Sequence, residues 1–170
     1  MSQKIDLYTS KMKYGGYFDF PKTYDFAYYW LEEEDCEPID EERYSEKQTG
    51  PDTKKLDIDW IAEKKFSDYF KFQFKISFQL IALKKVEITD PSGKKVKTNE
   101  GTCEVKIKGT LVKDAKNKFD QDSSWDKWMQ KIYEKWIVPD RIEFLEGEIV
   151  KFCDDFLGAM KEYFDITGRR

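Results

Sequence analysis

The chain has 170 residues, of which 38% are charged and 16% aromatic, and its net charge at pH 7 is −4. This length suits one domain, 1–170, that can bury roughly 70% of its unfolded surface. Histidine is absent, which excludes a nucleophile activated by histidine and any zinc site with a histidine ligand.

Other common sites and signals are also missing from the sequence. The three cysteines are far apart, and there is no CxxC pair, Walker A sequence or GxGxxG motif. No apolar signal region follows Met1, and no apolar run approaches the roughly 18 residues of a membrane span. We therefore expect a soluble cytoplasmic protein, and the sequence implies no metal and no cofactor.

The N-terminal third predicts a strand, a helix and an acidic loop. The strand covers Met12 to Phe20, with a bulge or bend at Gly15-Gly16. It opens the core of the domain, which we expect to span residues 12–165. Pro21 suits the first turn of a helix that reaches about Glu34. Residues 32–42 then carry eight carboxylates without the spacing of a calcium loop, so we expect a solvated loop there.

The middle third predicts an antiparallel sheet. Apolar and polar residues alternate strictly over residues 70–80, which indicates a long strand with one aromatic face and one wet face. The alternation fails at residues 80–83, where we expect a bulge or burial on both sides. Shorter alternating runs at 56–63 and 103–111 predict two more strands, and the sequence from Asp90 to Gly93 predicts a turn.

The last third changes to helical periodicity. Residues 124–138 predict an extra helix with three tryptophans on one face, and Pro139 predicts a break after it. A final helix then runs from Asp140 to about Phe164. Its expected apolar stripe is Ile142, Leu145, Ile149, Phe152, Cys153, Phe156, Met160 and Phe164.

This order of elements resembles the helix-grip superfamily, which is related to START domains (SRPBCC-like). The resemblance covers residues 12–165 and depends on the strand leading into Pro21, the aromatic strand and the terminal helix. The Gly-rich loop of some members is missing, and the extra Trp-bearing helix departs from the simplest pattern. The resemblance implies an α+β fold in which a curved antiparallel sheet wraps around the long C-terminal helix. It also implies a cavity between sheet and helix for a lipid or another apolar small molecule.

Two interpretations of the aromatic strand stay open. Its rings either line a ligand cavity against the last helix or close-pack as an ordinary core. Arg141, one of four arginines, is a candidate anchor for a ligand carboxylate, or else a surface residue of the first helical turn. The candidate cavity lining is Trp60, Phe70, Phe72, Phe74, Phe78, Phe156 and Met160.

The outer face of the final helix suggests an interface. Gly147 and Gly158 lie about 20° apart around the helix axis, roughly opposite the apolar stripe, and Phe144 lies near them. Such small residues let the Trp-bearing helix or another subunit approach closely. The alternative is that the two glycines are simply tolerated in the helix.

These observations predict a non-enzymatic module that binds a hydrophobic small molecule or lipid. The first alternative is a protein-interaction domain or homodimer that uses the glycine face or the acidic loop. A cyclase or hydrolase without histidine is a weaker alternative and requires a buried acid or tyrosine with a shifted pKa. Residues 54–118 carry 16 basic and 9 acidic side chains, but their wet face offers few aromatics, which disfavours nucleic acid as a partner.

Overall fold

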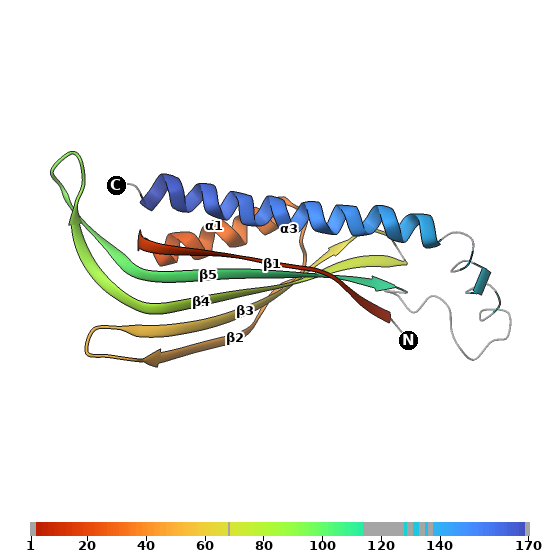
Figure 1. The fold of residues 1–170 in the computed structure, drawn as a ribbon, viewed down its shortest axis with the longest axis horizontal. Helices are drawn as coiled ribbons and strands as arrows, with labels where there is room; N and C mark the ends of the chain where they lie inside the picture. The colour runs from red at the N-terminus through yellow and green to blue at the C-terminus, as the bar shows by residue number, and fades with distance from the viewer. Residues whose placement is uncertain are drawn as a thin grey trace.

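In the structure, a computed structural model, the described residues form one curved antiparallel sheet with two helices on the same side (Figure 1). It describes residues 3–67, 69–113, 128, 131, 132, 135 and 138–168. The strand order is β1-β5-β4-β3-β2, so β1 and β2 form the two edges. The elements are β1 (Gln3–Phe18), α1 (Phe20–Glu33), β2 (Ile39–Gln48), β3 (Lys54–Lys65), β4 (Phe70–Thr89), β5 (Lys95–Lys113) and α3 (Val138–Gly168).

The alternation of the aromatic strand is confirmed in β4, where the apolar side chains from Phe70 to Leu80 are all buried. The strand lies between β3 and β5; within this stretch it pairs with β5 from Phe70 and with β3 from Lys71. Its core face therefore continues onto its neighbours, with Trp60 of β3 opposite Ile76 and Gly109 of β5 opposite Phe74. The predicted α+β class and antiparallel sheet are confirmed.

The predicted irregularity at residues 80–83 is a β-bulge. The register of β4 against β5 shifts between Ile81 and Lys84, and Ala82 adopts a left-handed φ of 54°. Gly101 lies directly against it, because a Cβ at this position would be 3.0–3.1 Å from backbone atoms of residues 81–83. The extra residue in β4 reverses the alternation of its side chains. Leu80 and Leu83 are therefore both buried, although residues three apart in a regular strand face opposite sides.

Helix α1 covers the sheet beside α3. Asp19 caps it by accepting a hydrogen bond from the backbone N–H of Lys22 at 3.2 Å. Thr23, Ala27 and Leu31 are buried against the sheet. Aromatic residues on other faces also make contacts: Phe26 stacks on Tyr163, and Trp30 packs against Phe152 and Phe156.

The last helix packs against β1 and β5. Of its predicted stripe, seven residues are buried and Ile142 is partly buried, and Leu157 is also buried. Gly109 allows this close packing, since a Cβ on residue 109 would lie 2.3 Å from Ile149 Cγ2. The helix begins at Val138, next to the predicted break at Pro139, and none of the helices in the described residues is long and apolar enough to cross a membrane.

Two predictions about local structure are wrong, and a third concerns residues that the structure for the most part does not describe. The pairing of Gly15 and Gly16 with β5 is regular, and the register shift in β1 lies between Asp6 and Tyr8 instead. The acidic loop ends early, because residues from Ile39 onward form β2. This strand has no buried face, so it lacks the alternation that identifies β3 and β4. The predicted Trp-bearing helix lies almost wholly outside the described residues, and two helices are seen within them.

Candidate functional site

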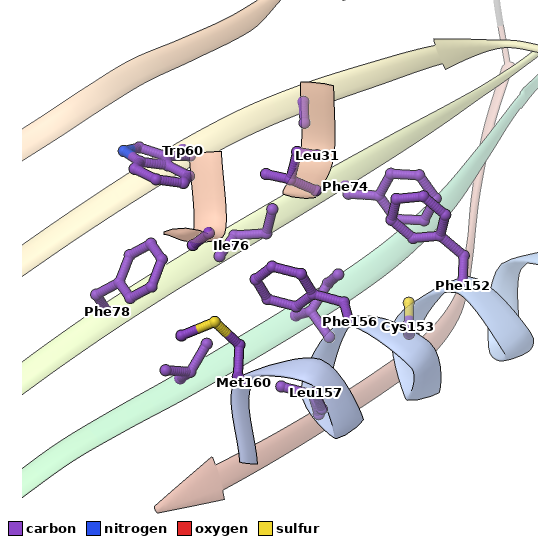
Figure 2. Close-up of a cluster of buried hydrophobic side chains, with 14 of the residues drawn as sticks. Leu31, Trp60, Phe74, Ile76, Phe78, Phe152, Cys153, Phe156, Leu157 and Met160 are labelled. Carbon is purple, nitrogen blue, oxygen red and sulfur yellow. The ribbon is translucent and has the colours of Figure 1, made fainter. Parts of the chain in front are cut away.

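The residues predicted to line a cavity come together in the middle of the molecule. All seven are buried, from 0% exposed at Phe74 to 4% at Phe72. Figure 2 shows rings from β3 and β4 facing side chains from α3, with Phe74 and Phe152 lying against each other. The centroids of these two rings are 4.0 Å apart, and those of Trp60 and Phe78 are 4.8 Å apart. These contacts are those of a close-packed core.

The larger clefts lie elsewhere. Beyond the bulge, residues 84–100 of β4 and β5 form a hairpin arm that curls upward at the left end of the sheet in Figure 1. A cleft of about 530 Å³, here called the arm cleft, lies between this arm and the start of α1. It is lined by Asp19, Pro21, Lys85, Val86, Glu87, Lys97, Thr98 and Asn99. None of the seven predicted residues lines it.

The register explains which arm residues face α1. Lys85 is opposite Asn99 and Glu87 is opposite Lys97, so these four side chains share one face of the hairpin. Asn99 Oδ1 accepts a hydrogen bond from the backbone N–H of Phe20 at 3.1 Å, which identifies this face as the one toward α1. The polar face of the arm therefore continues the apolar core face of β4 and β5.

The start of α1 is not itself a free anion site. The N–H of Phe20 bonds Asn99, that of Lys22 bonds the Asp19 side chain and that of Thr23 bonds the Asp19 carbonyl. Pro21 has no N–H to offer. Any anion in the arm cleft would have to use side chains.

Two lysines supply positive charge to the arm cleft. Neither Lys85 nor Lys97 forms an ion pair with a described residue, whereas Lys84 on the other face of the arm pairs with Glu100 at 3.1 Å. A second cleft of about 470 Å³ shares Lys85 and Asn99 and extends toward the turn between β2 and β3. The arm cleft thus places Pro21 beside two ammonium groups that have no ion-pair partner among the described residues, and the carboxylates of Asp19 and Glu87 line the same cleft.

The remaining candidate residues lie apart from these clefts. Arg141 is exposed near the start of α3 and lines neither cleft. Phe144 is 57% exposed, and its ring centroid lies 6.4 Å from that of Phe66. A Cβ at Gly147 or Gly158 would have no described atom within 4 Å. The described residues thus leave this face of α3 open, and the interface proposed for it stays a prediction.

The thiols and one tyrosine hydroxyl that could act as nucleophiles stay protonated near neutral pH. Cys36, Cys103 and Cys153 are buried and free, and burial raises the pKa of each thiol to about 12. Burial, with a hydrogen bond to Glu41, also raises the pKa of Tyr24 to about 12. Within the described residues, no three His, Cys, Asp or Glu side chains are grouped so as to hold a metal ion.

Sequence reasoning did not single out Lys85, Lys97 or Asn99. The available signal was the failed alternation at 80–83, followed by five lysines within residues 84–97. That pattern marks the point where the strands leave the apolar core, but it does not say that α1 begins opposite them.

Comparison of the chain with family models, with curated proteins and with solved structures finds no match in any of the three. The arguments about function therefore depend on the geometry described above.

Proposed function

We propose that the protein is a non-enzymatic binding module that holds an anionic amphiphile in the arm cleft. Such a ligand has an apolar chain and a carboxylate or phosphate group. The observation that carries the proposal is the cleft of about 530 Å³ between α1 and the hairpin arm, with Lys85 and Lys97 on its wall. Small-molecule sites typically have volumes of about 300–1,000 Å³.

The packed interior favours this position over the space between sheet and helix. Rings of β3, β4 and α3 already contact one another there, with centroids as close as 4.0 Å. Opening that space would separate stacked rings and expose buried apolar surface, at a cost of roughly 25 cal/mol per Å². The arm cleft needs no such rearrangement. A ligand chain can lie against Pro21 while its acidic group meets the lysines.

We also propose that the fold is related to the helix-grip superfamily. A five-stranded antiparallel sheet with a long C-terminal helix against it supports this relationship. The filled interior differs from the cavity that the resemblance implies. In this chain, α1 and the aromatic rings occupy the space, and the binding site lies at the open end of the sheet.

Titration with laurate, dodecylamine and acetate tests the ligand class. The first two have the same apolar chain and opposite charge, and acetate has the charge without the chain. We expect laurate to bind at least about tenfold more tightly than either of the others, by calorimetry below the micelle concentration. Equal binding of dodecylamine, or no binding of laurate, would contradict the proposal.

A pair of double variants tests the position. Lys85→Glu with Lys97→Glu takes the charged side chains that line the arm cleft from a net charge of zero to −4 and should weaken laurate binding at least about tenfold. Lys75→Glu with Lys106→Glu makes the same change at exposed positions outside the cleft and is the matched control. If both double variants bind laurate equally, the arm cleft is not the site.

A further inference from the structure

The outer edge of β2 has no neighbouring strand among the described residues. This strand is last in the strand order, and within the described residues it pairs only with β3. Every residue from Asp40 to Gln48 is exposed, so neither face is covered by a helix. An uncovered edge presents a row of backbone N–H and C=O groups to which another extended chain can add.

The chain leading into this edge carries unbalanced negative charge. None of the eight carboxylates in residues 32–42 forms an ion pair with a described residue. By contrast, Arg43 contacts the carboxylates of Asp57 and Asp59 on β3, both at 3.7 Å. The one cation in the first half of β2 is therefore already neutralised. Of the acidic residues before it, Glu41 accepts a hydrogen bond from Tyr24, and none has a cationic partner in the part of the chain that the structure describes.

A small cleft lies where this acidic segment meets the edge. Its volume is about 340 Å³, and it lies at the C-terminal end of α1. The partial negative charge of a helix C-terminus adds to that of the carboxylates. The Tyr28 ring, 37% exposed, provides a face against which a cation can pack. The lining residues are Tyr28, Glu32, Asp35, Cys36, Glu37 and Ile39.

We infer that the β2 edge is a docking surface for a basic, extended segment of a partner protein. The segment adds to the sheet as a strand beside β2, and one of its lysine or arginine side chains enters the cleft beside Tyr28. Charge complementarity selects this partner over a second copy of the chain. Two β2 edges brought together would place Asp40, Glu41 and Glu42 of both copies along one seam, which is repulsive.

Two synthetic peptides of about eight residues test the inference on the full chain. One alternates Lys with Val, and the other alternates Lys with Pro, which has the same charge but cannot form a strand ladder. We expect the Lys-Val peptide to bind at least about tenfold more tightly at low salt. Hydrogen exchange should slow at alternate β2 amides, those that do not bond to β3.

A variant with three neutralised carboxylates tests whether the acidic segment binds the peptide. Glu32→Gln, Asp35→Asn and Glu37→Gln together should weaken binding of the Lys-Val peptide at least about tenfold. The control changes three exposed acids of α3 in the same way, Glu143→Gln, Glu146→Gln and Asp155→Asn. Equal binding of the two peptides, unchanged exchange in β2, equal effects of the two triple variants, or self-association through β2 would each overturn the inference. These readouts do not depend on the arm cleft.

Discussion

The two halves of β4 behave differently although they belong to one strand. From Phe70 to Leu80 the inner side chains are apolar and buried beneath α1 and α3. From Lys84 to Thr89 the strand continues to pair with β5, but its inner positions carry Lys85 and Glu87 and border a cleft. Pairing with β5 therefore continues on both sides of the bulge, whereas pairing with β3 and the helix cover are limited to the inner half.

The comparison shows where a ligand can bind in this fold. A helix placed over aromatic rings fills the concave face, and the helices end before the sheet does. The bulge at residues 81–84 marks the boundary. A cleft remains where the sheet extends past the start of α1, because backbone pairing holds the arm in place without packing from above.

Removing one ring tests whether the inner half is filled. Phe74 is 0% exposed and stacks on Phe152. We expect Phe74→Ala to lower the free energy of unfolding by about 3–5 kcal/mol, measured by chemical denaturation, because it leaves a cavity. Lys75→Ala, an exposed neighbour, should change it by less than about 0.5 kcal/mol. A loss below about 1 kcal/mol for Phe74→Ala would indicate that the interior is not close-packed.

A methyl group added opposite the bulge, at residue 101, tests whether the bulge sets the position of the hairpin arm. Gly101→Ala places a Cβ 3.0–3.1 Å from backbone atoms of the bulge, so either the bulge or β5 must move. We expect a loss of about 1–3 kcal/mol in the free energy of unfolding and weaker laurate binding. Gly93→Ala at the tip of the hairpin is the control for laurate binding, since its φ of 86° also makes the substitution cost stability, but a Cβ there meets no described atom within 4 Å. Unchanged laurate binding in Gly101→Ala would show that the bulge does not shape the cleft.

Alkaline pH should destabilise the filled half through its thiols. Burial raises the pKa of Cys103 to about 12 from the ordinary thiol value of 9.0. The folded state therefore keeps the proton after the unfolded state has lost it, and stability falls between about pH 9 and 12. The slope due to this thiol should approach about 1.4 kcal/mol per pH unit. Unfolding of the parent chain and of Cys103→Ala at several pH values measures the difference, and identical slopes would contradict the assignment.

The outer face of α3 should gain stability when its glycines are replaced. Gly147→Ala and Gly158→Ala add methyl groups where no described atom lies within 4 Å. Each should raise the free energy of unfolding by about 1 kcal/mol, the difference in helix propensity. Higher stability with an unchanged oligomeric state, measured by ultracentrifugation, would exclude the glycine interface. Lower stability, or a change of oligomeric state, would support it.

Local patterns predicted the elements that have one buried face. The alternation of β3 and β4, the turn after Asp90 and the stripe of α3 all arise from side chains that must be buried or bonded. The edge strand β2 was missed because both of its faces are wet, so its sequence carries no period of two. The bulge was predicted at residues 80–83 because it interrupts a period that is otherwise strict.

The candidate site was less predictable than the fold. The sequence singled out the aromatic rings, and the structure places them together in the core. It did not single out Lys85, Lys97 or Asn99, because their proximity to Asp19 depends on contacts far apart in the chain. Arg141 is exposed instead of lying near that cleft.

The sequence by itself determined which side chains needed an apolar partner, since periodicity is a local property of the chain. It did so for the aromatic half of β4 and for the buried stripe of α3. Only the tertiary structure decided whether helices or a ligand cover those side chains. That outcome depends on how closely α3 approaches β5 at Gly109 and on where α1 begins relative to the bulge. Both are set by packing between distant segments, which no short stretch of sequence encodes.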